Sequence, residues 1–436
     1  MSDNKSNKLS RRSFIEKSAI SAAGLTLVPT FKGFSANDNI NLGFIGMGRQ
    51  AMFLLNGFIG LEGVKVVAGS DVYGIKRQRF ENRVNDFYKK KGTSVDVKTY
   101  EKYQDVLARE DIDAVVIAVP DHWHALIAID ALKSGKDVYL EKPLTFTILE
   151  GKTLVKAVRK YDKILAVGSQ QRSDPNFQHA VKLVQDGQLG EIEKVYSYVG
   201  APPTPYDLPR EILPSDLNWD LWLGPNPYVH YNHELAPPIS LDPPKNETLW
   251  GAWRWYKEMG GGFTTDWGAH MFDVAQWGLG EDRGGPIEII PAGYKDYKYL
   301  TYKYASGIMM TEEPFNDKKT KGVKFQGKDG WIEVSRGYFK ASDKKFNSNV
   351  KQESGPYETK IPHQVNFIES VRAHKDPQVP VETGHNTCVT CTLGNISYDL
   401  RRPVKWDPKK QEFVDDPQAE LYMHREYRKG YKLQDI

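Results

Sequence analysis

Short apolar runs alternate with longer segments of mixed character between residues 40 and 167. The run 113–119 is continuously apolar and rich in β-branched residues, which is typical of a parallel strand buried on both faces. Five more short runs, at 40–45, 64–68, 95–99, 137–140 and 164–167, are separated by helical patterns at 75–88, 103–108, 124–132 and 149–160. This alternation predicts an α/β domain over residues 37–168, built on a doubly wound parallel sheet.

The pattern changes after residue 169. A helix at 175–185 and a strand at 192–199 precede a long irregular stretch, 201–257, and such stretches are usually functional. Strand patterns then follow at 287–292, 299–304, 308–312, 323–326 and 330–335, with helices at 364–373 and 385–393. The turn Gly327-Lys328-Asp329-Gly330 joins the last two strands as a hairpin. We therefore expect a second α/β domain with a largely antiparallel sheet over 169–402, and a charged tail, 403–436, that wraps the surface.

The first predicted strand runs into a glycine-rich turn, Gly46-Met47-Gly48-Arg49-Gln50-Ala51, that opens a helix. Gly46 allows the tight turn and Gly48 lets the backbone approach a pyrophosphate, which the helix N-terminus attracts. Asp71, after the second strand, is placed to accept hydrogen bonds from ribose hydroxyls. The pattern predicts a Rossmann dinucleotide site that favours NAD. NADP is the alternative because Arg77 and Arg79 are near. Gly46, Met47, Gly48, Arg49, Gln50 and Asp71 are the expected cofactor contacts.

Glu141-Lys142-Pro143 begins where the strand 137–140 should end. That position is the carboxyl edge of the sheet, where doubly wound folds bind their ligands. An ammonium held there can meet both a nicotinamide ring and a substrate hydroxyl. Lys142 therefore indicates redox chemistry on an alcohol.

A second cluster of candidate residues follows Gly260-Gly261-Gly262. A helix expected over 265–277 would place Asp266 and His270 one turn apart on the same face. A histidine can accept a hydroxyl proton near neutral pH, and Asp266 can orient the substrate or fix the imidazole tautomer. The alternative interpretation is a surface carboxylate–imidazole pair without catalytic function. The three glycines before it and Lys142 in the other domain argue against that interpretation.

The N-terminus has a different character from the rest of the chain. Of the formal charge of +3, residues 1–36 contribute +4, so the remainder carries about −1 and gives no sign of nucleic-acid binding. Ser10-Arg11-Arg12-Ser13-Phe14-Ile15 resembles a twin-arginine export signal, with cleavage expected near Ser35 or Ala36. A disordered basic tail is the alternative. No later segment has 18 continuous apolar residues, so we expect a periplasmic protein without a membrane span.

Three further features bear on the ligand. Cys388 and Cys391 form a lone CxxC on a helical pattern, which favours packing over a redox or metal role. His230 and His233 lack an evident third ligand, so no metal site is expected. Seven of the ten tryptophans lie between residues 219 and 277, and aromatic faces pack well against sugars. Trp255 and Tyr256 are the expected substrate contacts from this segment.

At this point the sequence resembles the glucose–fructose oxidoreductase, inositol dehydrogenase and MocA (Gfo/Idh/MocA) family. The matching motifs are Gly46-Met47-Gly48, Val119-Pro120-Asp121-His122, Glu141-Lys142-Pro143, and Gly261-Gly262 with Asp266 and His270. The resemblance implies catalytic roles for Lys142, Asp266 and His270, and homo-oligomers formed through the second sheet. The residues expected beside the nicotinamide are Pro120, His122, His124 and Glu141. For His122 and His124 the alternative is a structural role at the start of a helix. Gln170 and Arg172 are expected near the substrate, Arg172 by position alone.

Together these features predict an exported NAD(P)-dependent oxidoreductase acting on a sugar, sugar acid or glycoside, within polysaccharide breakdown. Free NAD is not expected in the periplasm, so a tightly held, internally recycled cofactor is inferred. The alternative is a glycosidase or lyase that oxidises a sugar transiently, eliminates its substituent and reduces the product. A third reading, a catalytically silent sugar or dinucleotide sensor, is disfavoured by the presence of Lys142, Asp266 and His270.

Overall fold

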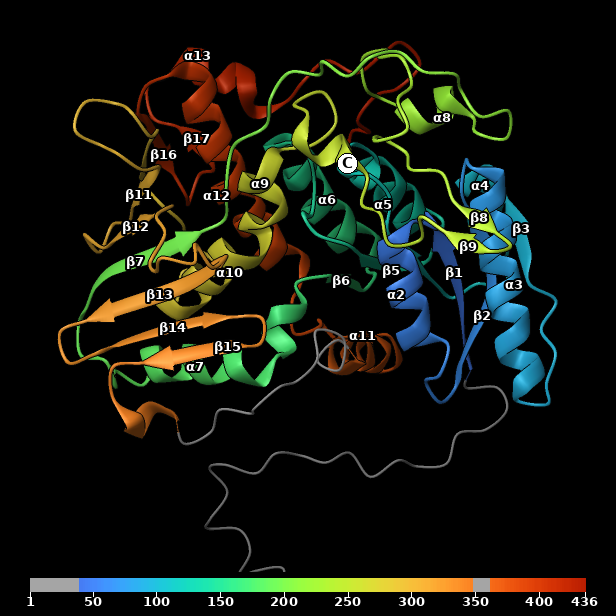
Figure 1. The fold of residues 1–436 in the computed structure, drawn as a ribbon, viewed down its shortest axis with the longest axis horizontal. Helices are drawn as coiled ribbons and strands as arrows, with labels where there is room; N and C mark the ends of the chain where they lie inside the picture. The colour runs from blue at the N-terminus through green and yellow to red at the C-terminus, as the bar shows by residue number, and fades with distance from the viewer. Residues whose placement is uncertain (1–38, 348–360) are drawn as a thin grey trace, which may run out of the picture. The chain divides into compact units, whose positions relative to one another are not determined.

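The computed structural model describes residues 39–347 and 361–436, shown in colour in Figure 1. The expected export signal, residues 1–36, lies outside these ranges. Across the described ranges, no helix has the length and apolar character needed to cross a bilayer.

The first sheet is fully parallel, as the sequence predicts, with the strand order β3-β2-β1-β4-β5-β6. Its strands are β1 (Ile40–Ile45), β2 (Val64–Ser70), β3 (Lys98–Tyr100), β4 (Ala114–Ile117), β5 (Asp137–Leu140) and β6 (Leu165–Val167). Strand β3 begins three residues later than expected. The amide of Val97 donates to the carbonyl of Val95 instead of joining the ladder, so the segment before Lys98 forms a local turn.

Helices cover both faces of this sheet (Figure 1): α2 (Arg49–Phe58), α3 (Gly74–Lys90), α4 (Tyr103–Leu107), α5 (His124–Lys133) and α6 (Ile148–Tyr161). Strand β4 shows why its sequence is continuously apolar. Val115 and Ile117 pack into one core layer, whereas Ala114 and Val116 pack into the layer on the opposite face. A short 3-10 turn, η1 (Asp121–Trp123), links β4 to α5.

The second sheet has nine strands in the order β15-β14-β13-β7-β12-β11-β10-β16-β17. They are β7 (Ile192–Tyr198), β10 (Glu288–Ile290), β11 (Thr301–Lys303), β12 (Met309–Thr311), β13 (Gly322–Gly327), β14 (Trp331–Ser335), β15 (Tyr338–Ala341), β16 (Val404–Asp407) and β17 (Glu412–Phe413). Only the β7–β12 pairing is parallel, so the expectation of a largely antiparallel sheet is confirmed. The β13–β14 hairpin is also confirmed, since Val323 pairs with Val334.

Helices η2 (Gln170–Ser173), α7 (Pro175–Gln185), α9 (Gly262–Asp266), α10 (Gly268–Leu279) and α12 (Val381–Leu400) accompany this sheet (Figure 1). Three of them, α7, α10 and α12, contribute to its core. In this core the ring of Phe272, on α10, lies 5.2 Å from that of Tyr302, on β11. The irregular stretch 201–257 forms only short elements, α8 (Trp219–Leu223), β8 (Ser240–Leu241), β9 (Pro244–Lys245) and η3 (Ala252–Trp255).

The structure does not separate a C-terminal tail from the second domain at residue 402, where the sequence predicts the boundary. Strand β16 pairs with β10 inside the nine-stranded sheet, and the Trp406 side chain is buried. In β16 the side chains of Val404 and Trp406 point inward and that of Lys405 points outward. This alternation is short and lies in a charged segment, so the sequence did not indicate a strand. Helix α11 (Ile361–Ala373) instead joins the first domain, where Phe367 packs in the layer that contains α2. The remaining elements are η4 (Lys344–Asn347), α13 (Pro417–Glu420) and η5 (Leu421–Met423).

Candidate active site

The glycine-rich turn borders a cavity of about 1140 Å³, larger than the roughly 300–1,000 Å³ of most small-molecule pockets. Gly46 has φ +85°, and a Cβ atom there would lie 2.5 Å from the carbonyl oxygen of Ala118. No side chain caps the N-terminus of α2 at Gly48. Gly46, Gly48, Arg49 and Gln50 all line the cavity, so the backbone amides at this helix start are available to an anionic ligand.

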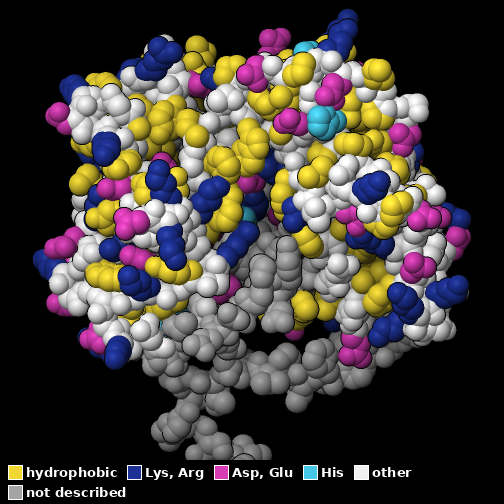
Figure 2. Space-filling view, viewed as in Figure 1, with side chains coloured by type: hydrophobic (Ala, Val, Ile, Leu, Met, Phe, Trp, Pro, Cys, Tyr) yellow, Lys and Arg dark blue, Asp and Glu magenta, His cyan; other side chains and the backbone are white. Residues whose placement is uncertain are grey.

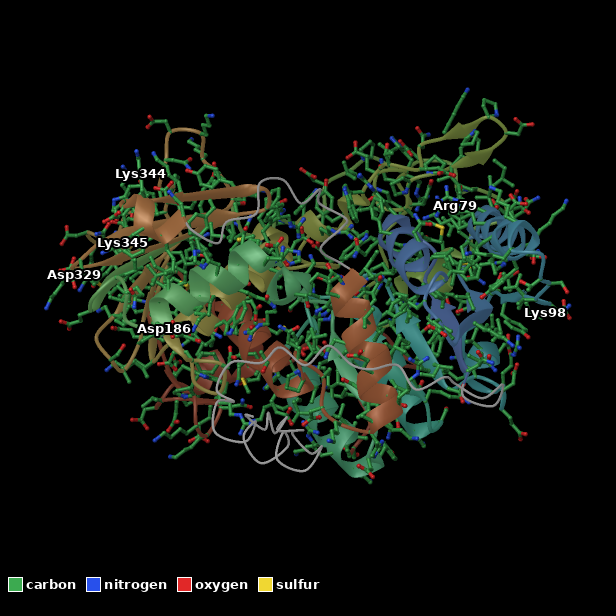
Figure 3. All side chains as sticks on the ribbon, turned by 90° about the horizontal axis from the view of Figure 1, so that it is seen from below. Arg79, Lys98, Asp186, Asp329, Lys344 and Lys345 are labelled. Atoms are coloured by element: carbon green, nitrogen blue, oxygen red, sulfur yellow. The ribbon has the colours of Figure 1, made fainter. Side chains whose placement is uncertain are left out.

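Asp71 lies at the end of β2 and lines the same cavity. Its carboxylate accepts hydrogen bonds from the amides of Met47 (2.7 Å) and Tyr73 (2.9 Å), which fix it beside the turn. The Met47 side chain itself is fully buried, so only its backbone faces this region. Arg79, on α3 and labelled in Figure 3, also borders the cavity but donates to the carbonyl of Met47. The two glycines and the uncapped N-terminus of α2 fit the pyrophosphate of NAD, and Asp71 fits its adenosine ribose.

A second cavity, of about 270 Å³, adjoins the first through shared lining residues that include Gln50, Val119 and Arg254. Lys142, at the end of β5, extends into it. The Lys142 Nζ donates to both the carboxylate and the main-chain oxygen of Asp266, each at 2.8 Å. Lys142 follows a strand of the parallel sheet, whereas Asp266 belongs to a helix that accompanies the second sheet. Both side chains are mostly buried. The structure therefore joins the two motifs at one point.

The helix expected over 265–277 is broken at Trp267. Helix α9 ends at Asp266 and α10 begins at Gly268, with the amide of His270 bonded to the carbonyl of Trp267 at 3.0 Å. Gly262 starts α9 at φ +68°, where a Cβ atom would lie 2.4 Å from the backbone nitrogen of Pro203. Despite the break, Asp266 and His270 both line the smaller cavity.

His270 is held by residues that the sequence did not indicate. The Arg336 Nη2 lies 2.8 Å from its Nε2, and because a guanidinium can only donate, Nε2 accepts. The Gln171 amide, with its oxygen turned toward Arg336, accepts from the guanidinium at 2.8 Å and also reaches Nδ1 of His270. Arg336 follows β14, 66 residues from His270, so no local motif links the two. The contacts fix the imidazole orientation at the cavity wall.

Two aspartates in the smaller cavity have opposite character. Burial alone would raise the pKa of Asp266, but the charges of Lys142 and Arg254 outweigh it and hold that pKa below its ordinary value. Burial raises the pKa of Asp121 to about 8, even though Arg254 and Lys142 act against it. Asp266 is therefore ionised at neutral pH and Asp121 is mainly protonated. Asp121, which the sequence indicates only as part of the motif Val119-Pro120-Asp121-His122, is a further site residue.

Glu141 also faces the smaller cavity. Its Oε1 accepts hydrogen bonds from the amides of Gln50 (2.7 Å) and Gln170 (2.8 Å). Gln50 comes from the glycine-rich turn and Gln170 from η2, after β6. The three side chains thus form one wall on the side of the parallel sheet. Pro120 borders the larger cavity beside this wall.

Of the two places expected for His122 and His124, the structure shows the helix start, since His122 lies in η1 and His124 begins α5. Both side chains are buried and line neither cavity formed by the described residues. The ring of His122 contacts the carbonyls of Trp222 (3.0 Å) and Met259 (3.4 Å), and that of His124 contacts those of Pro143 (2.7 Å) and Val119 (3.0 Å). Burial lowers the pKa to about 3 for His122 and about 4 for His124. They are neutral groups that fix the loops at the start of α5.

Arg172 and Tyr256 are also placed differently from expectation. The Arg172 guanidinium is buried in ion pairs with Asp273 (2.8 Å) and Asp282 (2.7 Å), so its donors are committed away from both cavities. Tyr256 packs against Tyr206 at 5.3 Å within a separate core and does not border either cavity. Trp255 does line the smaller cavity, stacked on Phe263 at 4.1 Å.

Other candidate residues have structural roles. Cys388 and Cys391 are buried free thiols, and the Cys388 Sγ donates to the carbonyl of Thr145, which confirms the packing interpretation. His230 bonds the carbonyl of Leu208, whereas His233 bonds Glu211 at the surface. Of the seven clustered tryptophans, Trp250, Trp253, Trp255 and Trp267 line the smaller cavity.

Comparison with known proteins agrees with this architecture. Residues 40–169 match a family model described as the oxidoreductase family, NAD-binding Rossmann fold, and residues 183–433 match its C-terminal alpha/beta domain. A glycosyl hydrolase family 109 protein from Shewanella putrefaciens is 29% identical over 157 residues, 36% of this chain and 34% of that protein. The match therefore spans about a third of this curated relative's length.

Two solved structures illustrate the similarity in fold. The WlbA dehydrogenase from Bordetella pertussis, in complex with NADH and UDP-GlcNAcA, aligns with a TM-score of 0.60 at 18% identity, over 85% of this chain and 98% of that one. The scyllo-inositol dehydrogenase from Lactobacillus casei, with bound NAD(H) and scyllo-inositol, aligns with a TM-score of 0.56 at 14% identity, over 84% and 99%.

Proposed function

The chain belongs to the Gfo/Idh/MocA oxidoreductase family, and from that premise we propose that it oxidises a hydroxyl-bearing carbon of a sugar, sugar acid or glycoside with NAD, or reduces the corresponding carbonyl with NADH. One observation carries the proposal. The Lys142–Asp266 pair and His270 line a small cavity that adjoins the cavity of the glycine-rich turn. A panel of sugars and sugar acids, assayed for NADH formation, tests it. No turnover with any member, in a protein shown to bind NAD, would count against it.

The chemistry divides between cofactor and protein. NAD, when bound, supplies the acceptor for a hydride from the substrate carbon. The ammonium of Lys142, held by Asp266 at 2.8 Å, can polarise the reacting hydroxyl or carbonyl oxygen. As hydride leaves, the hydroxyl proton passes to His270, leaving a carbonyl group on the substrate. For this step the substrate hydroxyl must replace Arg336 on the Nε2 of His270.

The walls of the smaller cavity support a carbohydrate ligand. Trp255, Phe263 and Trp267 provide aromatic faces, and Gln170 and Arg254 provide polar groups. Aromatic faces pack against sugar C–H surfaces while polar groups take the hydroxyls.

Asp71 is expected to set the cofactor preference. Changing Asp71→Asn removes the charge that repels a 2′-phosphate and weakens the hydrogen bonds to ribose hydroxyls. We expect the Kd for NAD to rise about tenfold and the preference over NADP to shrink. Titration calorimetry with both dinucleotides measures the change, with Asp86→Asn, at an exposed position on α3, as the control. Equal NAD affinity in wild type and Asp71→Asn would contradict the assignment.

We propose that the enzyme acts in the periplasm on material from polysaccharide breakdown and retains its cofactor there. The C-terminal tail supports retention, since Gly430, Tyr431 and Gln434 line the same cavity as Gly46 and Asp71. The chain's end, marked C in Figure 1, belongs to this tail. The twin-arginine motif stays a prediction, as does a homo-oligomer formed through the second sheet. Fractionation of cells that express the full chain tests the location.

Tyr431→Ala is expected to loosen the cofactor. The Tyr431 ring packs edge-on against Trp123 at 5.6 Å, and both border the cavity. Losing that wall should raise the NAD dissociation rate about threefold to tenfold, measured by loss of bound dinucleotide during gel filtration. Tyr422→Ala, at an exposed tail position away from the cavity, is the matched control. If both variants retain cofactor like the wild type, the tail does not close the site.

A glycosidase that uses NAD transiently is the second candidate, favoured by the similarity to family 109 glycosyl hydrolases. Such an enzyme would oxidise a ring carbon, eliminate the glycosidic substituent, add water and reduce the ring, with no net redox change. A nitrophenyl glycoside panel separates the two. Release of nitrophenol without accumulation of NADH would favour the glycosidase, and stoichiometric NADH with no nitrophenol would favour the dehydrogenase.

A further inference from the structure

Asp121 is a buried acid at the carboxyl edge of the parallel sheet. It lies in η1, shortly after β4, and its side chain is only 4% exposed. Ile117 at the end of β4 pairs with Leu140 at the end of β5. Asp121 and Lys142 therefore leave the sheet at neighbouring points of one edge. Both line the smaller cavity, where the reacting group binds in the proposed function.

The smaller cavity surrounds Asp121 with basic and aromatic walls. Lys142, Arg254, His270 and Trp255 line it together with Asp121. The face drawn in Figure 2 has a hollow with Lys and Arg side chains around it and a histidine inside it. Such walls suit a neutral ring compound that carries several oxygen atoms, because aromatic faces take its C–H surface and polar groups its oxygens.

The carboxyl of Asp121 has no partner of its own. Within residues 39–347 and 361–436 its side chain makes no hydrogen bond and no ion pair. Lys142 and Arg254 instead share the carboxylate of Asp266, at 2.8 and 3.4 Å. Buried polar groups are nearly always hydrogen-bonded, and an exception in a cavity wall is explained when a ligand supplies the bond.

The surroundings of Asp121 favour its neutral form. The charged and titratable groups that act on it come from several elements: Arg254 on η3, Lys142 after β5, Asp266 on α9, Glu150 on α6 and Cys388 on α12. Burial raises the pKa of Cys388 to about 11, so this thiol is neutral, and two cations face two carboxylates. A buried carboxylate without a partner is costly, and burial raises the pKa of Asp121 to about 8.

A neutral carboxyl can do what an ionised one cannot. It donates its O–H to an oxygen atom, whereas a carboxylate only accepts. A hydroxyl group both donates and accepts, so it can pair with either form of the acid. A carbonyl oxygen only accepts and can pair with the neutral form alone. Buried neutral acids are used in this way to hold the oxygen of a reacting carbonyl group.

We propose that Asp121 donates a hydrogen bond to the carbonyl oxygen of the oxidised sugar, beside the ammonium of Lys142. This inference rests on the proposed function, since it adds a substrate-binding residue to the same site. In the direction of reduction, the carbonyl carbon accepts hydride from NADH and its oxygen takes the proton of His270. Asp121 keeps its own proton throughout. The site then favours the carbonyl form of the substrate below about pH 8.

Two pairs of neutral ring compounds, each an alcohol and its ketone, test the inference by calorimetry: myo-inositol with scyllo-inosose, and 1,5-anhydro-D-glucitol with 1,5-anhydro-D-fructose. The ketones are titrated into protein loaded with NAD and the alcohols into protein loaded with NADH, so that no mixture can react. Because an acid of pKa about 8 is about tenfold more ionised than neutral at about pH 9, at least one ketone should bind about tenfold more weakly there than at about pH 6.5. Its alcohol should change by less than about threefold.

Asp121→Asn is the decisive variant, since its amide still donates but cannot ionise. We expect this variant to bind the ketone equally, within about threefold, at both pH values. Asp121→Leu removes the donor and should weaken ketone binding about tenfold at the lower pH, with the Kd for NAD changed less than about twofold. Asp329→Asn, in the exposed β13–β14 turn and labelled in Figure 3, should keep the pH dependence of the wild type.

Ketones that bind equally at both pH values, or that do not bind, would overturn the inference, as would a pH dependence that survives Asp121→Asn. Turnover of any sugar in the NADH assay would then leave the proposed function standing. A weaker affinity for NAD in Asp121→Leu would assign the carboxyl to the cofactor and also overturn the inference. A wild-type protein that binds no NAD would overturn the proposed function itself, and the inference with it.

Discussion

Lys142→Met is expected to lower kcat about a thousandfold while the Kd for NAD changes by less than about threefold. The methionine keeps most of the aliphatic stem but removes the ammonium, which lies 2.8 Å from Asp266 and polarises the reacting oxygen in the proposed mechanism. Loss of one preorganised donor to a developing charge typically costs about 10²–10³ in kcat, and Lys142 also sets the position of Asp266. NAD binding should persist because the glycine-rich turn and Asp71 lie in the adjoining cavity.

Steady-state turnover and calorimetric NAD binding measure this prediction on the same preparation. Lys160→Met, an exposed position on α6, removes the same charge far from the cavity and should behave like the wild type. Turnover by Lys142→Met within tenfold of the wild type would refute the role assigned to the ammonium. A parallel loss of NAD binding would show instead that Lys142 serves the cofactor.

His270→Asn is expected to lower kcat by about 10²–10⁴, the usual contribution of a general acid–base group. The asparagine can still accept from Arg336 and preserve the cavity wall, but it cannot carry the proton. Substrate binding should therefore change little, and the loss should appear in kcat with KM nearly constant. The measurement compares kcat and KM with those of His374→Asn, an exposed histidine at the surface.

An unchanged kcat in His270→Asn would assign proton transfer to another group. Asp121 is the first alternative, since it lines the same cavity and burial raises its pKa to about 8, so its carboxyl can donate the proton in the direction that reduces a carbonyl. Asp121→Asn would then show the loss expected for His270→Asn. The two single variants together identify the proton carrier.

The sequence predicts those parts of the site that depend on local structure. Lys142 follows a strand whose apolar pattern is strong, and its place at the sheet edge follows from the parallel fold. Asp266 and His270 reach one cavity although the helix between them breaks at Trp267, because Trp267 keeps right-handed helical backbone angles and the chain continues from α9 into α10. The parallel sheet was also predictable, since strands such as β4 are short continuous apolar runs, whereas the polar strand β3 (Lys98–Tyr100) was placed three residues too early.

Residues brought together by distant pairing were not predictable in this way. Arg336 reaches His270 only through the β13–β14 ladder, and nothing near either residue in the sequence indicates the contact. Arg172 was expected in the site, but its partners Asp273 and Asp282 lie about a hundred residues further along the chain. Strand β16 was missed because its alternation spans four residues in a charged tail.

The central claim is that the glycine-rich turn, Asp71 and Lys142 form one dinucleotide-dependent redox site. The most direct test denatures protein purified without added cofactor and identifies any released dinucleotide by mass, with calorimetric titration of NAD if none is found. We predict NAD or NADH, close to one per chain if the tail retains it, or reversible NAD binding if it does not. A protein that releases no dinucleotide and binds no added NAD or NADP would contradict the claim.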